Sequence, residues 1–245
     1  MNRFLVPCLA APGNKITITD KKQVHHIKDV LHLKAGKPVA LFDGLGNEAQ
    51  AEIERISETG IKLIISQKPV LNPRKSSINI ACAIPKKSKF DDIVDKLTQL
   101  GVDRIIPLKT ERAVVKLSIQ KGEARLQRWV KIALSAAQQS QRSILPQISP
   151  LTDFRELIKK STGFNLKLIP TLEGERKTLK EALSPVLPLP ANILILIGPE
   201  GDFSPKEIDL ALKHNFIPVS LGSTVLRVET AAIAVASFIN LNEDR

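Results

Sequence analysis

Apolar and polar positions along the chain follow two different periods, and the period changes near residue 70. Before that point, short apolar runs are separated by polar turns, which is the pattern of a small β-rich unit. Lys21–Leu33 has helical spacing with Asp20 as its N-cap, and the pair Asp43-Gly44 is a hairpin signal. We expect strands at Lys15–Asp20, Pro38–Asp43, Asn47–Ile56 and Gly60–Gln67.

The later part of the chain alternates apolar strands with helical segments. Apolar residues recur at helical spacing over Phe90–Leu100, which Gly101 ends, over Glu123–Ser140 and over Ala231–Asn240. Such alternation predicts an α/β domain with a mostly parallel sheet. We expect its strands at Ile78–Ile84, Arg104–Leu108, Leu166–Ile169, Ile193–Ile197 and Ile217–Leu221.

The segment between these two patterns, from Pro69 to Ser77, contains prolines and a polar cluster and is the predicted linker. A chain of 245 residues is long enough for a small domain and a medium one. We therefore predict domains over residues 1–72 and 73–245.

The composition excludes several classes of protein. No run of 18 apolar residues is present, so we expect no membrane span, and the first residues lack the pattern of a signal peptide. The two cysteines, Cys8 and Cys82, lie far apart in apolar surroundings. A disulfide or a thiolate metal site is therefore not expected, and a reducing cytoplasm is the predicted compartment.

The net charge of +11 is concentrated in the middle of the chain. Residues 74–160 hold 18 basic and 8 acidic side chains, whereas residues 1–73 hold 10 and 7 and residues 161–245 hold 8 and 10. A local excess of this size attracts polyanions, although a generally basic, solvated surface has the same charge. Aromatic residues are scarce (8 Phe, 1 Trp, no Tyr), which favours RNA contacts through phosphates over base stacking.

Two glycine-bearing loops follow predicted buried strands near the C-terminus. The first runs from Gly198 to Gly201 and is followed by Ser204, Pro205 and Glu207, a capping box with proline at the first helical position. The second runs from Leu221 to Arg227 and leads into the Ala-rich helix. In open α/β sheets, ligands bind outside the carboxyl ends of strands, so these loops form a candidate cofactor pocket. A pair of ordinary turns is the alternative that spacing alone leaves open.

Other chemistries lack their motifs. The chain contains no G-x-x-x-x-G-K-[ST], no G-x-G-x-x-G and no G-x-S-x-G sequence. His25, His26 and His32 cluster within one predicted helix, but no carboxylate or thiolate ligand set accompanies them. No bound metal is therefore expected.

Two C-terminal blocks, Gly198-Pro-Glu-Gly-Asp-Phe-Ser204 and Leu221-Gly-Ser-Thr-Val-Leu-Arg-Val-Glu-Thr-Ala231, closely resemble the signature of the RsmE family. That family consists of 16S ribosomal RNA uridine N3-methyltransferases within the SPOUT class. The likeness extends over nearly the whole chain, and the order and spacing of its pieces make it specific. The other pieces are Arg3-Phe4, His25-His26-Ile27, Leu41–Gly44, Lys96 with Leu100–Val102, Pro107, Glu111-Arg112, Arg128–Ala133, Gln139-Ser140, Arg142 and Pro146.

Three positions depart from the family pattern. Gln99 and Gln138 stand where the family often has Glu, which leaves the roles of these helix-surface sites open. Asp202 replaces a frequent Gly after Gly-Pro-Glu-Gly, at the border of the predicted pocket.

The resemblance implies an N-terminal PUA-like β-barrel domain that binds RNA and a C-terminal SPOUT α/β domain with a trefoil knot that forms a homodimer. It also implies S-adenosyl-L-methionine (SAM) as the cofactor. SAM carries no phosphate, so backbone groups and apolar walls suffice to hold it. The implied cofactor-binding residues are Thr171, Leu172, Glu173, Ile197, Gly198, Pro199, Glu200, Gly201, Leu221, Gly222, Leu226 and Arg227.

Methylation at uracil N3 requires that the N3 proton leaves before or during attack. A base, or a cation that stabilises the uracil anion, is therefore needed. Arg227 and Arg142 are the candidate cations, and Glu200 and Glu229 are the candidate bases. Phosphate contact alone is the alternative for Arg142, and helix capping is the alternative for Glu229.

The RNA-binding residues implied by charge and resemblance come from both predicted domains, and the three lysines among them are equally consistent with a solvated charged face. They are Arg3, Lys86, Lys87, Lys89, Arg112, Gln139, Ser140 and Arg142.

The predicted function is SAM-dependent methylation of N3 of a specific uridine in 16S rRNA, either free or within the 30S subunit, with no metal and no membrane partner. One alternative is another SPOUT RNA methyltransferase, acting on a ribose 2′-OH or a different base. A second is a non-catalytic RNA-binding factor for ribosome assembly, and a third is a basic protein with no nucleic acid role.

Overall fold

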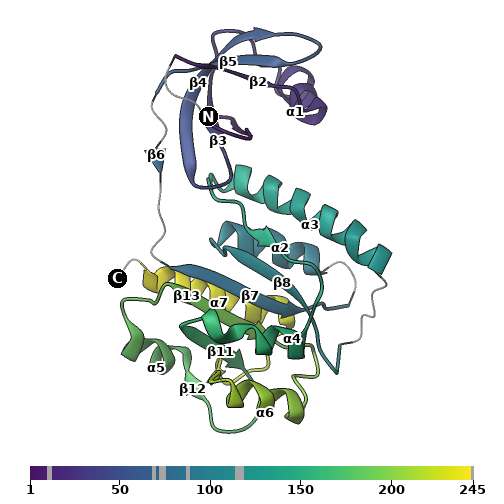
Figure 1. The fold of residues 1–245 in the computed structure, drawn as a ribbon, viewed down its shortest axis with the longest axis vertical. Coiled ribbons are helices and arrows are strands. Elements are labelled where there is room, and N and C mark those ends of the chain that lie inside the picture. Colours follow the sequence, from purple (N-terminus) through teal and green to yellow (C-terminus); the bar gives the residue numbers. More distant parts are fainter. Residues whose placement is uncertain (10–12, 68–69, 72–75, 87–88, 114–118, 244–245) are drawn as a thin grey trace. The chain divides into compact units, whose positions relative to one another are not determined.

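The computed structural model describes residues 1–9, 13–67, 70–71, 76–86, 89–113 and 119–243 (Figure 1). The chain divides into two compact units, and the division falls inside helix α3 (Ile119–Gln139). Unit 1 comprises Met1–Pro73 with Ala137–Leu145, and unit 2 comprises Arg74–Ala136 with Pro146–Arg245.

Unit 1 is built on a six-stranded sheet with the order β1-β3-β4-β5-β2, in which β6 also pairs with β4. The β1–β3 pair is parallel, and the other pairs are antiparallel. Burial alternates along β4, so one face of the strand is turned to the core of the unit and the other to solvent. The strands are β1 (Arg3–Leu5), β2 (Lys15–Ile18), β3 (Pro38–Phe42), β4 (Asn47–Ile56), β5 (Ile61–Ile65) and β6 (Val70–Leu71).

Helix α1 (Lys21–His25) begins as the sequence predicts, because the Asp20 carboxylate accepts the N–H of Gln23 at 2.9 Å. The expected continuation of this helix to Leu33 is wrong. A single π-helical turn, η1 (His26–Val30), follows instead, and His32 then adopts a φ of 49°, which ends the helical path.

The segment 137–145 joins unit 1 although it is distant from it in sequence. The N–H of Leu145 donates to the carbonyl of Gly44 at 2.9 Å, and the N–H of Gly46 donates to the carbonyl of Ser143 at 3.2 Å. The Gln138 amide also donates to a backbone carbonyl of β1. No local sequence pattern signals this association.

Unit 2 is built on an eight-stranded sheet with the order β10-β8-β7-β13-β11-β14-β12, in which β9 also pairs with β8. Every pair in this sheet is parallel, as the alternation of strands and helices predicts. The strands are β7 (Ser77–Ala83), β8 (Arg104–Lys109), β9 (Gln147–Ile148), β10 (Thr152–Asp153), β11 (Leu166–Pro170), β12 (Lys177–Thr178), β13 (Asn192–Ile197) and β14 (Ile217–Ser220).

Helices cover both faces of this sheet (Figure 1). Strand β13 shows the consequence, since Ile193, Ile195 and Ile197 enter one apolar cluster and Leu194 and Leu196 enter the other. A continuous apolar run is therefore buried on both sides, as expected for a central parallel strand. One face is covered by α2 (Lys89–Gln99), α3, α5 (Leu179–Leu183) and α7 (Val228–Glu243), and the other by α4 (Phe154–Lys159) and α6 (Pro205–Lys213).

The expected strands and long helices are confirmed, mostly to within a few residues. Helix α7 begins at Val228, three residues before the expected start. The short elements β1, β9, β10, β12, α4 and α5 and the 3₁₀ turns η2 (Ser161–Gly163) and η3 (Ser184–Val186) were not individually expected, because two to six residues carry too little periodicity to be recognised.

Candidate active site

Three loops of unit 2 meet in one pocket at the carboxyl ends of three adjacent parallel strands. Strand β11 lies between β13 and β14, so the segments that follow them leave the sheet at the same edge. Including its open mouth, the pocket has a volume of about 590 Å³. Its lining consists of Pro170, Thr171, Leu172, Arg176, Ile197, Gly198, Pro199, Glu200, Asp202, Ser220, Leu221, Gly222, Thr224, Val225, Leu226, Val228 and Ala231.

The walls combine apolar side chains with a few charged groups. Leu172 is 44% exposed and Val225 is 72% exposed, so the pocket presents apolar surface that the protein itself leaves uncovered. The charged lining residues are Arg176, Glu200 and Asp202. Such a pocket suits an uncharged ring system joined to a group that carries charge.

Asp202 links two of the three loops. Its carboxylate accepts the N–H of Leu172 at 2.8 Å and the N–H of Phe203 at 2.8 Å, while its own N–H donates to the carbonyl of Pro199 at 3.0 Å. The residue has a φ of 59°, in the left-handed region, which Gly enters freely and which Asp and Asn tolerate better than most other residues. This conformation gives a physical reason for the frequent Gly of the family at this position.

Arg112 holds the same loop from a different segment of unit 2. Its guanidinium Nη1 donates to the carbonyl of Gly201 at 2.8 Å and to the carbonyl of Phe203 at 3.4 Å. Arg112 follows β8, so the segment after that strand is tied to the loop after β13. Arg112, which charge and resemblance predict to contact RNA, therefore has hydrogen-bond partners next to the pocket.

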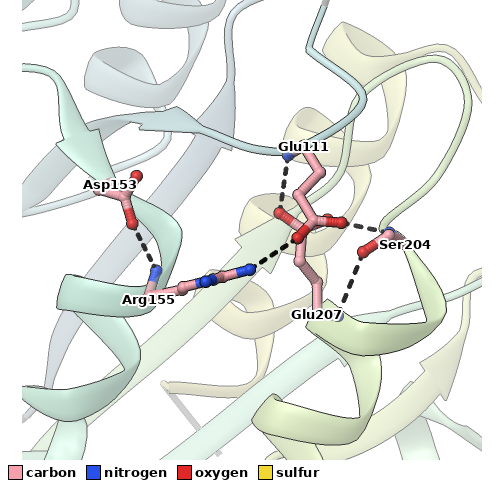
Figure 2. A network of polar contacts seen from close by, with 5 residues as sticks. All are labelled: Glu111, Asp153, Arg155, Ser204 and Glu207. Atoms are coloured by element: carbon pink, nitrogen blue, oxygen red, sulfur yellow. Dashed lines mark hydrogen bonds and ion pairs between the residues drawn. The ribbon is translucent and has the colours of Figure 1, made fainter.

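A buried carboxylate fixes the start of α6 (Figure 2). Glu207 is 3% exposed and accepts the N–H of Ser204 at 2.9 Å and the N–H of Glu111 at 2.9 Å. The Ser204 hydroxyl accepts the N–H of Glu207 in return, which confirms the predicted capping box. Hydrogen bonds from Ser204 and Arg155 lower the pKa of Glu111. In Figure 2, Arg155 reaches Glu111 from the start of α4, where Asp153 is the N-cap.

An ion pair lies at the start of α7. The Nζ of Lys89, the first residue of α2, is 2.5 Å from Oε1 of Glu229. Burial raises the pKa of Glu229, but hydrogen bonds from Lys89 and the backbone, with the charges of Lys89 and Arg227, outweigh burial and lower the pKa overall. Burial, followed by the charges of Glu229 and Glu200, raises the pKa of the Cys82 thiol. Cys82 is therefore a protonated core residue.

Nine of the twelve residues expected to bind the cofactor line this pocket. They are Thr171, Leu172, Ile197, Gly198, Pro199, Glu200, Leu221, Gly222 and Leu226. Glu173, Gly201 and Arg227 are immediate chain neighbours of lining residues but not part of the lining. Eight lining residues were not among the twelve. Asp202 was expected at the border of the pocket, and Thr224 and Val225 lie within the second glycine-bearing loop. Pro170, Ser220, Val228 and Ala231 flank the loops on strands and on α7, and Arg176 returns to the pocket by tertiary folding.

The four candidate catalytic residues have different surroundings. Glu200 lines the pocket, and its carboxylate accepts the N–H of Lys86 at 3.4 Å. Arg227 is exposed and follows directly after a lining residue. Glu229 is held in the ion pair with Lys89. Arg142 belongs to unit 1, where its backbone N–H donates to a carbonyl near the end of α3.

The expected RNA-binding residues are also diverse. Arg3 is nearly buried, with a side chain 7% exposed that pairs through two nitrogens with Glu48 at 2.6 and 3.0 Å. Lys86 and Gln139 are exposed, whereas Ser140 is half-buried at the end of α3. Lys87 lies outside the described residues. Lys89, Arg112 and Arg142 have the surroundings given above.

The described residues contain neither a cluster suited to a metal ion nor a membrane-spanning helix. No group of three His, Cys, Asp or Glu side chains there is arranged to hold a metal ion. No helix in the same part of the chain is long and apolar enough to cross a membrane.

The chain is similar over nearly its whole length to one group of proteins. Residues 72–240 match the model of an RNA methyltransferase domain, and residues 18–66 match that of an RNA methyltransferase PUA domain. Ribosomal RNA small subunit methyltransferase E from Synechocystis is 32% identical over 92% of this chain and 72% of that protein. The protein of the same name from Rickettsia conorii is 30% identical over 98% and 95%.

Solved structures of similar proteins also match nearly the whole length of this chain. A methyltransferase from Legionella pneumophila with bound SAM has a TM-score of 0.86 and 32% identity, covering 98% of this chain and 96% of that chain. Ribosomal RNA small subunit methyltransferase E from Neisseria gonorrhoeae, bound to SAM, has a TM-score of 0.87 and 28% identity, covering 98% and 97%.

Proposed function

The chain belongs to the ribosomal RNA small subunit methyltransferase E family, and from this we propose that it transfers a methyl group from SAM to N3 of a specific uridine in 16S rRNA. The observation that supports this most directly is the single pocket formed by the loops after β11, β13 and β14. Two similar structures contain bound SAM and match the chain over almost all of its length.

The residues of the pocket fit this cofactor. SAM supplies a reactive methyl group on a cationic sulfonium, so the protein has to provide orientation and a suitable electrostatic environment. The uncovered side chains of Leu172 and Val225 offer apolar surface for the adenine ring. The carboxylates of Glu200 and Asp202 place negative charge in the lining, which favours a cationic ligand.

Of the two candidate bases, we favour Glu200 as the acceptor of the N3 proton. Its carboxylate lines the pocket and lies near the backbone N–H of Lys86. Glu229 is held by Lys89, and its lowered pKa makes it the weaker proton acceptor. Arg227 is the proposed cation that stabilises the uracil anion, with Arg142 of unit 1 as the other candidate.

Unit 1 is the proposed RNA-binding part, because the PUA domain model matches residues 18–66. The excess of basic residues in 74–160 adds a further attraction for phosphates. A closed barrel in unit 1, a trefoil knot in unit 2, a division into domains 1–72 and 73–245, a homodimer and a cytoplasmic location belong to the same proposal. The barrel, the knot and the homodimer rest on the resemblance to the family, whereas the domain division rests also on the predicted linker and the location on the two cysteines.

A methyl-transfer assay tests the proposal. The purified protein is incubated with methyl-labelled SAM and either 30S subunits or free 16S rRNA from a strain that lacks the gene, and the RNA is digested to nucleosides. We expect the label in N3-methyluridine, and Glu200→Gln and Arg227→Ala should reduce its formation. Label in a 2′-O-methylated nucleoside would favour the other SPOUT chemistry.

Two further measurements separate the remaining alternatives. Isothermal titration calorimetry with SAM should show binding, and its absence would favour a non-catalytic assembly factor. Primer extension should stop at the target uridine in rRNA from the parent strain, because N3-methylation blocks base pairing. A stop that persists in the deletion strain would contradict the assignment.

A further inference from the structure

Asp202 holds a position whose backbone conformation favours glycine, and its surroundings give the carboxylate a role. The residue lines the pocket, is half-buried and adopts a left-handed backbone conformation with a φ of 59°. Glycine reaches this conformation more easily than aspartate does. The backbone conformation therefore favours glycine over aspartate at this position.

The carboxylate uses both of its oxygens. Oδ1 accepts the N–H of Phe203 at 2.8 Å, within the loop that follows β13. Oδ2 accepts the N–H of Leu172 at 2.8 Å, from the loop that follows β11 and 30 residues away in the sequence. The second bond crosses from one wall of the pocket to another, which a glycine has no side chain to do.

This bond is the one that holds the Leu172 backbone itself, while the neighbouring residues are held by other bonds, among them that from the Thr171 hydroxyl to the carbonyl of Glu173. The neighbouring Thr171 is fixed to the sheet through its N–H, which donates to the carbonyl of Val219. Its own carbonyl accepts a hydrogen bond from Arg176. Leu172 itself is 44% exposed, and its N–H donates to Asp202. The cross-link thus sets where the apolar Leu172 side chain stands before any ligand arrives.

We propose that Asp202 is a positioning residue that joins two walls of the SAM pocket and so pre-organises it for the cofactor. This inference rests on the proposed function, because it concerns the same pocket. A preformed pocket binds more tightly, since the loop does not have to be ordered on binding. The loop after β13 is also held by Arg112, so loss of the Asp202 bonds releases chiefly the Leu172 wall.

Two substitutions of Asp202 separate its bonds from its backbone conformation. Asp202→Gly removes both side-chain bonds but relieves the left-handed backbone, and because these two effects oppose each other, stability should change little while SAM affinity falls. Asp202→Asn keeps one acceptor oxygen and turns an NH₂ group toward one of the two N–H donors. It should retain one bond at most and fall between the wild type and the glycine variant.

The matched control is Asn215→Gly. Asn215 has a φ of 62°, also in unit 2, but does not line the pocket. It therefore undergoes the same relief of backbone strain without touching the proposed cross-link. Its stability should be unchanged or higher, because only the backbone strain is relieved, and its affinity for SAM should stay at the wild-type value.

SAM binding to the full-length proteins is measured by isothermal titration calorimetry, with stability measured in parallel by urea unfolding. We expect the dissociation constant of Asp202→Gly to rise about three- to tenfold, because the released Leu172 segment has to be ordered when SAM binds. If the wild type binds SAM and Asp202→Gly binds it with the same affinity, the inference is overturned while the proposed function stands. No SAM binding by the wild type would instead overturn the proposed function. A parallel loss of stability and affinity in Asp202→Gly would show a merely structural role and also refute the inference.

Discussion

Replacement of Glu207 by alanine tests the hydrogen-bond network that fixes the start of α6. The carboxylate is 3% exposed and accepts two backbone N–H groups, those of Ser204 and Glu111, both at 2.9 Å. The alanine variant leaves both donors without this acceptor. An unsatisfied buried donor costs about 1–3 kcal/mol. The Ser204 N–H is buried, whereas the Glu111 N–H is only partly buried and gains a water molecule.

The expected loss is therefore about 2–4 kcal/mol for Glu207→Ala, the larger share coming from Ser204. Glu207→Gln keeps one acceptor oxygen, so its loss should be about half as large. Asp209→Ala is the matched control, because Asp209 is an exposed carboxylate on the same helix. Its effect should stay within about 0.5 kcal/mol.

Urea unfolding followed by tryptophan fluorescence measures these changes within unit 2. Trp129 is the single tryptophan of the chain, is 3% exposed and packs against Phe90 with ring centroids 4.5 Å apart. The unfolding midpoint should shift while the slope of the free energy against urea stays the same. A loss below about 1 kcal/mol for Glu207→Ala would refute the reasoning that both donors depend on this carboxylate.

Three further predictions follow from the same geometry. Gly198→Ala should weaken SAM binding, because a Cβ there lies 3.1 Å from the ring of a buried phenylalanine, whereas Gly163→Ala, with open space around it, should leave binding unchanged in calorimetry. The lowered pKa of Glu229 means that its ion pair contributes stability above the ordinary glutamate pKa and loses it as the pH falls through the lowered value. Urea midpoints measured across this acidic range should thus depend less on pH in Glu229→Gln, and an unchanged dependence would contradict the pairing. A thiol reagent should modify the exposed Cys8 in the native protein and Cys82 after unfolding, so two reactive thiols in the native state would argue against the buried position of Cys82.

Local signals in the sequence were sufficient for much of the fold. The capping box of Ser204 and Glu207 was predictable because all of its hydrogen bonds lie within four residues. The site of the pocket was predictable for a related reason. Loops that follow strands of one parallel sheet leave it at the same edge, so the strand pattern near Ile193–Ile197 and Ile217–Leu221 already placed the two glycine-bearing loops at one edge.

The parts that sequence reasoning missed depend on partners far apart in the chain. The bond from Glu111 to Glu207 spans 96 residues, and that from Arg112 to Gly201 spans 89. Charge and resemblance predicted that Arg112 contacts RNA. They could not reveal which carbonyls the folded chain brings near its guanidinium. The attachment of segment 137–145 to unit 1 has no local pattern either, since its hydrogen bonds form with main-chain groups of distant residues.

The two ends of the eight-stranded sheet constrain how copies of this protein associate. Its outermost strands, β9 and β10 on one side and β12 on the other, have two residues each, so this sheet offers a neighbouring molecule only short free ladders to extend. Growth of the sheet from one molecule into the next is therefore disfavoured, which guards against fibre-like assembly. The proposed homodimer, if formed through unit 2, would accordingly be built from helices and loops, where side chains rather than main-chain groups decide which surfaces recognise each other.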